Sequence, residues 1–289
     1  MSIDCVLPAA ARLGECPLWS AADECLYWID IEGRRVHRYD PATGIDESRD
    51  TVGRPGSLAA TGERGRLLLA TEHAVGWFDW GSGSFAPWRE LEPAGTRNRL
   101  NDGRCDPAGR FWVGSMWERP DERRFTGMLH CVEPTGKVTT ACREIGVSNG
   151  LAFSPDGTTM YFADSLRRTV WAYDYDVSAG SAENERVFTD FTDLPGTPDG
   201  ACVDEDGGYW IACIDGWAVA RLTPDGTVDR VVEIPVERPT MPAFGGPGLD
   251  TLFVTSIAAG GPPGDQPCAG GLLALDVGTR GIPEPGFAG

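Results

Sequence analysis

Four side chains with oxygen donors stand at matching places in short apolar segments of the sequence. Each lies four residues before the apolar residue that ends its segment, and the four are Glu15, Asn101, Asn149 and Asp199. Carboxylate and carboxamide oxygens are hard ligands, which suit calcium, magnesium or manganese and leave positions open for water and substrate. Buried carboxylates without partners are costly and repel each other, and a shared cation removes both penalties. The pattern therefore indicates one oxygen-ligated divalent cation.

These segments belong to a repeat that consists of a short apolar strand, a turn rich in Pro, Asp and Gly, and a second apolar strand. The second strands of the six copies are centred near Trp28, Leu68, Trp112, Phe162, Trp210 and Phe253. Their spacing of about 40 to 50 residues is typical of a four-stranded propeller blade, whose faces only its neighbours can cover. We therefore expect an all-β, six-bladed β-propeller of four-stranded blades, forming one domain over residues 1–289. Residues 3–10 are expected to supply the outer strand of the last blade.

The first strand of every propeller blade lines the central channel, so equivalent positions form a ring. The position that carries the four oxygen donors is occupied, in chain order, by Glu15, Gly56, Asn101, Asn149, Asp199 and Thr240. An alternative interpretation is that the Asn-Asp-Gly, Asn-Gly and Asp-Gly steps at residues 101, 149 and 199 are only turn formers. Glu15 discriminates between the two, because Glu has no special turn propensity.

The amino-acid composition argues against several classes of function. The formal net charge is -18 and no Lys/Arg cluster offsets it, which argues against nucleic acid as a partner. The apolar runs are far shorter than a membrane span, and the N-terminus does not have the pattern of a signal peptide, so we expect a cytoplasmic protein. The nine Cys include no CxxC pair and are expected to be reduced, mostly buried thiols. The oligomeric state is not indicated.

Other catalytic patterns are weaker. His37, His73 and His130 lack the spacing of metal ligands, and we expect each of them on a hairpin surface. The sequence has no G-x-S-x-G elbow and no glycine-rich phosphate loop. The tryptophans occur at core positions of the repeat, so Trp19 and its counterparts at 112 and 210 are expected to serve packing rather than sugar binding.

The sequence resembles the SMP-30/gluconolactonase/regucalcin family along nearly its whole length. The resemblance is carried by Leu13-Gly-Glu-Cys-Pro-Leu-Trp19, Asn98-Arg-Leu-Asn-Asp-Gly103, Gly114-Ser-Met116, Ser148-Asn-Gly-Leu-Ala-Phe-Ser-Pro-Asp-Gly157, Pro198-Asp-Gly200 and Phe244-Gly-Gly246. The chain departs from the family pattern at Cys16, where Gly is more usual, and at Asp215-Gly216-Trp217, where a Gly-rich stretch is expected.

This resemblance implies a sugar lactone hydrolase that uses one divalent ion, whether calcium, magnesium, manganese, zinc or iron(II). It implies metal ligands at Glu15, Asn149 and Asp199, a general base at Asp199, and substrate contacts at Arg99, Asn101 and Glu118. The substrate would be an aldonolactone such as gluconolactone or a pentonolactone. Two alternatives remain: a related ester or phosphotriester hydrolase, and a metal-binding propeller without lactonase activity.

Overall fold

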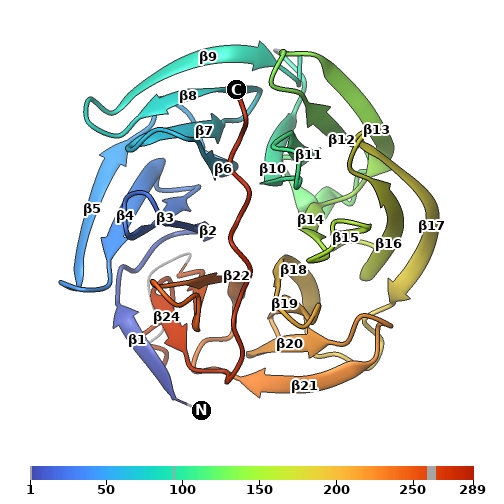
Figure 1. Ribbon diagram of the computed structural model, residues 1–289. Helices are drawn as coiled ribbons and strands as arrows, with labels where there is room; N and C mark the ends of the chain where they lie inside the picture. Colours follow the sequence, from blue (N-terminus) through green and yellow to red (C-terminus); the bar gives the residue numbers. More distant parts are fainter. Residues whose placement is uncertain (1, 94, 259–264) are drawn as a thin grey trace.

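The computed structural model describes residues 2–93, 95–258 and 265–289. Within these ranges, 24 β-strands form six antiparallel sheets of four strands each. Figure 1 shows the sheets arranged around a central axis, with β2, β6, β10, β14, β18 and β22 innermost. The expected six-bladed β-propeller of four-stranded blades is confirmed.

The first three blades follow the chain without interruption. Blade 1 contains β2 (Gly14–Ser20), β3 (Cys25–Asp30), β4 (Arg35–Asp40) and β5 (Ile45–Asp50). Blade 2 contains β6 (Ser57–Ala60), β7 (Arg66–Ala70), β8 (Ala74–Asp79) and β9 (Ser84–Glu90). Blade 3 contains β10 (Asn98–Cys105), β11 (Phe111–Trp117), β12 (Gly127–Val132) and β13 (Val138–Ile145), with the short 3-10 helix η1 (Pro120–Glu122) after β11.

The remaining blades repeat this order until the last one. Blade 4 contains β14 (Ser148–Phe153), β15 (Thr159–Asp164), β16 (Thr169–Asp176) and β17 (Ser181–Thr189). Blade 5 contains β18 (Thr197–Val203), β19 (Tyr209–Ile214), β20 (Ala218–Leu222) and β21 (Val228–Glu233). Blade 6 contains β22 (Pro239–Gly245), β23 (Thr251–Ser256), β24 (Leu272–Leu275) and, as its outer strand, β1 (Ile3–Leu7).

The pairing of β1 with β24 closes the ring. The two strands are antiparallel, with Ile3 opposite Leu275 and Cys5 opposite Leu273. The first and last parts of the chain thus share one sheet, as expected from residues 3–10. Closure also covers the edge of β24, which would otherwise expose unpaired backbone groups.

The core lies between adjacent blades. Every residue of β3 is buried, because a second strand has neighbouring blades on both faces. Trp28, Trp112 and Trp210 are at most 1% exposed, and Trp19 is 7% exposed. The predicted packing role of the tryptophans is confirmed. Burying an aromatic side chain of this size stabilises the fold by about 2–3 kcal/mol.

The histidine prediction is wrong in two cases. His37 is 8% exposed, stacks on Trp28 with ring centroids 3.9 Å apart, and hydrogen-bonds Asp46 through Nδ1 at 2.7 Å. His130 is 4% exposed. Each of the two residues lies on the third strand of its blade, where its ring is buried in the space between adjacent blades. The nine cysteines are all free thiols and six are buried, as expected.

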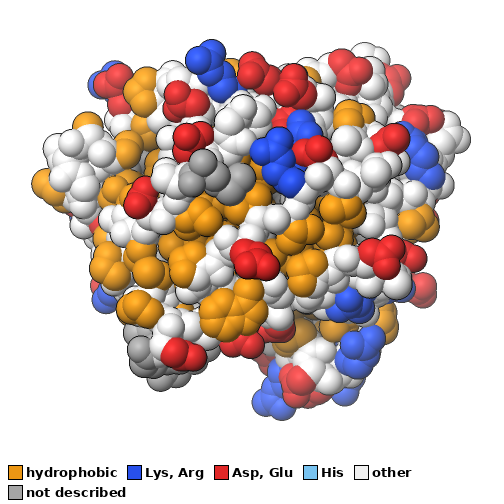
Figure 2. Space-filling model, turned by 90° about the horizontal axis from the view of Figure 1, so that it is seen from below, with side chains coloured by type: hydrophobic (Ala, Val, Ile, Leu, Met, Phe, Trp, Pro, Cys, Tyr) orange, Lys and Arg blue, Asp and Glu red, His pale blue; other side chains and the backbone are white. Residues whose placement is uncertain are grey.

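One side of the disc carries mixed charges. Figure 2 shows one side, where Asp and Glu side chains are interspersed with Lys and Arg around a band of apolar side chains. In the part of the chain that the structure describes, no helix is long and apolar enough to cross a membrane.

Residues 276–289 form a feature that the repeat pattern did not predict. Figure 1 shows this C-terminal segment crossing the disc from blade 6 toward blades 2 and 3. The carbonyl of Arg280 accepts the Glu205 N–H at 2.8 Å, and the N–H of Phe287 donates to the Ala60 carbonyl at 2.8 Å. Between these anchors, Glu284 forms an ion pair with Arg104 of β10.

Phe287 fastens this segment and is a suitable test of its contribution. Its ring is 2% exposed and lies 5.7 Å from Trp77 and 5.8 Å from Trp88, measured between centroids. We expect Phe287→Ala to lower the free energy of unfolding by about 3 kcal/mol, because the truncation leaves a cavity. Val52→Ala, at a side chain 90% exposed, should change it by less than about 0.5 kcal/mol. Urea denaturation followed by tryptophan fluorescence measures both, and equal midpoints would contradict the anchoring role.

Candidate metal and substrate site

A β-bulge interrupts the inner strand of five blades at nearly the same level. The register with the second strand shifts between Glu15 and Leu18, Leu100 and Gly103, Asn149 and Ala152, Pro198 and Ala201, and Pro239 and Pro242. A bulge adds one residue, bends the strand and re-aims side chains, and it is common beside active sites. The four predicted oxygen donors therefore lie at or directly before a bulge.

Two of these bulges need a left-handed backbone. Gly150 has φ 63°, which costs glycine little. Cys16, directly after Glu15, has φ 47°, a conformation that is strained for a side chain with a Cβ. A side chain at this point therefore has a structural cost, although the Cys16 thiol accepts the Leu58 N–H of blade 2 at 3.3 Å.

Hydrogen bonds join Arg99 and Asn101 of β10 to Asn149 of β14. Arg99 Nη1 donates to Asn101 Oδ1 at 2.6 Å. Asn101 Nδ2 donates to the Ser148 carbonyl at 2.8 Å and to Asn149 Oδ1 at 3.0 Å. All three predicted residues are less than 9% exposed. The structure thus brings them together and orients the Asn149 carboxamide.

A second chain of hydrogen bonds leads from Asn149 to Asp199 of β18. Asn149 Nδ2 donates to Ser165 Oγ at 2.8 Å, and Ser165 Oγ donates to the Pro198 carbonyl at 2.6 Å. Since Nδ2 is held by Ser165, the Asn149 oxygen faces the other way and keeps a lone pair for a ligand. Asp199 follows Pro198 directly and is 6% exposed.

Glu15 and Asp199 interact with each other electrostatically. Burial raises the pKa of Glu15 to about 8, and the charge of Asp102 contributes to this shift. Burial also raises the pKa of Asp199 well above its usual range, with Glu15 as the second cause and Asp102 as the third. The Cys16 N–H, which donates to Glu15 Oε2 at 3.0 Å, opposes the shift of Glu15. Two acidic side chains from blades 1 and 5 therefore repel each other at the channel.

Arg99 keeps its positive charge at neutral pH. Burial and the neighbouring Arg54 lower the pKa of Arg99 to about 10, while Glu32, Glu15 and Glu72 oppose this shift. A guanidinium with that pKa remains protonated, and its planar donors can hold substrate oxygens.

Glu118 stands apart from the other predicted site residues. Its carboxylate lies 3.6 Å from Arg54 Nη2 and 3.7 Å from Arg97 Nε, and its side chain is 30% exposed. Arg54 connects it to the site, because Arg54 also influences Arg99 and contacts Glu72 at 2.7 Å. Glu118 therefore lies at the mouth of the site rather than among the buried oxygen donors.

Sequence reasoning missed Arg54 and Asp102 as parts of this site. Arg54 precedes β6 in a Gly-Arg-Pro-Gly stretch that reads only as a loop. Asp102 belongs to the Asn101-Asp102-Gly103 motif. Because this motif is typical of turns, the sequence did not indicate that the Asp102 carboxylate is buried.

The donor set fits a hard divalent cation. It offers the half-buried Glu15 carboxylate, the buried Asp199 carboxylate and one oriented carboxamide oxygen, all oxygen ligands of the kind that calcium or magnesium prefers. Among the described residues, no three His, Cys, Asp or Glu side chains form a metal-binding group by themselves. The candidate set differs from such a group because Asn149 is its third member.

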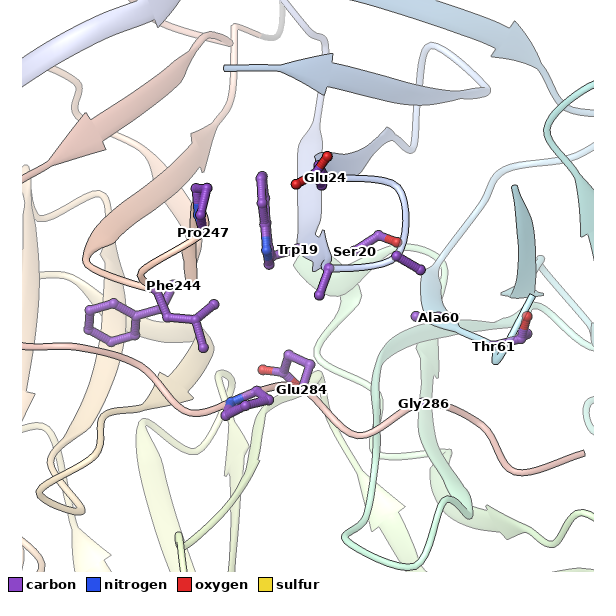
Figure 3. A pocket seen from close by; sticks show the side chains of 13 residues that line it. Trp19, Ser20, Glu24, Ala60, Thr61, Phe244, Pro247, Glu284 and Gly286 are labelled. Atoms are coloured by element: carbon purple, nitrogen blue, oxygen red, sulfur yellow. The ribbon is translucent and has the colours of Figure 1, made fainter. Parts of the chain in front are cut away.

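A pocket of about 480 Å³ lies at the other end of the channel. Figure 3 shows Trp19, Phe244 and Glu284 around it. Trp19 and Phe244 stand at the C-terminal ends of inner strands, whereas Glu15 and its partners stand nearer the N-terminal ends of the inner strands. This pocket is therefore separate from the candidate site.

A sequence profile described as the SMP-30/gluconolactonase/LRE-like region matches residues 13–258. The chain belongs to this family. Two relatives within the SMP-30/gluconolactonase family are named for lactone hydrolysis. The 6-deoxy-6-sulfogluconolactonase of Pseudomonas putida is 38% identical, over 100% of this chain and 99% of the relative. The pentonolactonase of Haloferax volcanii is 35% identical, over 98% of this chain and 97% of the relative.

A solved structure in this SMP-30/gluconolactonase family matches the fold closely. It is regucalcin from Agrobacterium tumefaciens, described as a calcium-binding protein, with a TM-score of 0.92 and 30% sequence identity. The match covers 98% of this chain and 96% of that one. The resemblance inferred from short motifs is thus confirmed across the whole propeller.

The raised pKa of Glu15 predicts how stability changes with pH in the presence of a chelator. With its raised pKa, Glu15 retains a proton in the folded state up to about pH 8, whereas in the unfolded state it loses that proton near the ordinary glutamate pKa of 4.5. The folded state then binds more protons, so the free energy of unfolding falls as pH rises from about 5 to 8. Glu15→Gln cannot ionise and should reduce this slope by up to about 1.4 kcal/mol per pH unit. Urea denaturation at several pH values measures the slope, and an unchanged slope in the variant would refute the shift.

Proposed function

We propose that this protein hydrolyses a sugar lactone to its sugar acid at one divalent cation held by Glu15, Asn149 and Asp199. The observation that carries the proposal is the meeting of two mutually repelling carboxylates with an oriented carboxamide oxygen. The names of the two lactonase relatives support the reaction type. The calcium-binding description of the regucalcin structure supports the cation.

The reaction adds water to the lactone carbonyl carbon and breaks the ring C–O bond, which leaves a carboxylate and a hydroxyl group. When bound, the cation would polarise the carbonyl and stabilise the negative charge that develops on its oxygen. Asp199 accepts the proton of the attacking water as general base. The protonated base can then return that proton to the departing ring oxygen. The second hydrogen of the water remains on the new carboxylic acid, which releases it to the solvent and becomes the carboxylate, so that charge and protons balance over one turnover.

Arg99 and Asn101 would hold the substrate. Asn101 Nδ2 has already donated both hydrogens, so Asn101 can bind a sugar hydroxyl only through the second lone pair of Oδ1. Arg99 uses Nη1 for the Leu100 carbonyl and for Asn101, which leaves Nε and Nη2 for lactone oxygens. Glu118, at the mouth, would accept a hydrogen bond from a more distant hydroxyl group. This donor and acceptor pattern suits a polyhydroxyl lactone.

Lactone hydrolysis releases acid, so a pH-drop assay with a panel of aldonolactones tests the proposal. The panel contains gluconolactone and pentonolactones, and the assay runs with and without chelator. We expect acid release that chelation reduces to the uncatalysed rate and that added calcium, magnesium or manganese restores. Cation binding without acid release from any lactone would instead favour a non-catalytic metal-binding propeller.

Asp199→Asn tests the general base. The change keeps the size of the side chain and one oxygen donor but removes its ability to accept a proton. We expect kcat to fall by at least about 100-fold at saturating metal. Asp225→Asn, on an exposed hairpin, is the matched control and should keep kcat within about twofold. Near-unchanged turnover of Asp199→Asn with metal bound would show that another group is the base.

A further inference from the structure

Asp102 is a buried carboxylate that has no role in the proposed reaction. It lies in the β10 bulge next to Asn101 and is 6% exposed. Its Oδ2 accepts the Leu151 N–H of blade 4 at 3.0 Å. Its Oδ1 is buried and has no hydrogen-bond partner among the described residues.

The hydrogen bond to Leu151 explains the position of Asp102 but not its charge. Leu151 lies in the β14 bulge, where its N–H has no partner in the ladder to β15. A buried N–H needs an acceptor, and a carboxamide oxygen would serve as well as a carboxylate. Asn at this position would make the bond without burying a negative charge.

Among the described residues, no cationic side chain forms a hydrogen bond with Asp102, although burial raises the pKa of Asp102 and the charge of Arg104 lowers it. Arg104 stands two residues away, but its Nη1 contacts Glu284 and its Nη2 donates to the Ala201 carbonyl at 2.7 Å. A buried carboxylate without a hydrogen-bonded cation is destabilising. Asp102 instead lies beside the proposed ligands, because its chain neighbour Asn101 donates to Asn149 Oδ1 at 3.0 Å and its hydrogen-bond partner Leu151 stands two residues after Asn149. In the absence of a cation, Asp102 therefore destabilises the site.

We propose that Asp102 is the third negative charge of the cation centre, which raises affinity for a divalent ion through its electrostatic field without ligating it. The inference rests on the proposed function, since it requires the centre at Glu15, Asn149 and Asp199. A role at a distance agrees with the absence, among the described residues, of any group of three acidic side chains arranged as ligands. A doubly charged ion gains twice as much from such a field as a singly charged ion.

Two substitutions separate the charge of Asp102 from its hydrogen bond. Asp102→Asn keeps an acceptor for Leu151 and removes the charge. We expect the Kd for calcium, measured by isothermal titration calorimetry on chelator-treated protein, to rise at least about tenfold. The Tm of the metal-free variant should equal or exceed that of the unchanged protein, because repulsion among the acids is relieved. Asp102→Glu keeps the charge and displaces the hydrogen bond, so its Kd should stay within about threefold while its Tm falls.

Asp30→Asn is the matched control. Asp30 is 7% exposed and its carboxylate accepts backbone N–H groups of Leu13 and Gly33 at 3.0 and 2.8 Å. We expect its loss of charge to lower Tm while the Kd for calcium stays within about twofold.

Three outcomes would overturn the inference. A Kd for Asp102→Asn within twofold of the unchanged protein would make Asp102 only a hydrogen-bond acceptor. If that variant does not fold, a tenfold higher Kd for folded Asp102→Glu would likewise show that Asp102 is only a hydrogen-bond acceptor. Failure of the unchanged protein to bind calcium or manganese would overturn the cation centre itself, and with it the proposed function.

Discussion

The repulsion between Glu15 and Asp199 is the interaction around which the centre of this propeller is organised. Burial raises the pKa of each of the two carboxyl groups, and the charge of Glu15 contributes to the shift of Asp199. Only a frame with a large surplus of apolar burial can hold such groups together. The six interblade clusters supply that surplus, and the closed ring keeps the inner strands from separating.

The inner strands are also tied to one another by polar contacts. Thr240 Oγ1 donates to the Gly14 carbonyl, which links blade 6 to blade 1. Asn101 links blade 3 to blade 4, and Ser165 links blade 4 to blade 5. These bonds fix the heights at which Glu15, Asn149 and Asp199 lie. The site is therefore assembled by the ring as a whole, since its three oxygen donors come from three blades.

The sequence was sufficient to predict the architecture and the meeting of Asn101 with Asn149 for a physical reason. A blade must repeat its apolar pattern, so a polar residue that recurs at one phase of that pattern stands out, as Glu15 does. Asp102, Arg54 and the C-terminal segment could not be found in this way. Asp102 shares a motif with turn formers, and Arg54 acquires its place only when loops of different blades meet at the mouth. Residues 276–289 lie outside the repeat, so the repeat pattern says nothing about them. His37 is buried because it stacks on an aromatic ring, which its polar neighbours in the sequence do not indicate.

The segment of residues 276–289 also affects the end of the propeller from which a ligand can reach the candidate site. Pro285 of this segment lines, together with Arg104 and Met241, a space of about 10 Å³, which is close to the least that one water molecule needs. Among the described residues, the segment thus lies across the ends of the inner strands that are away from Glu15 and Asp199. A ligand of the candidate site would then enter and leave at the opposite end, where Arg54 and Glu118 lie.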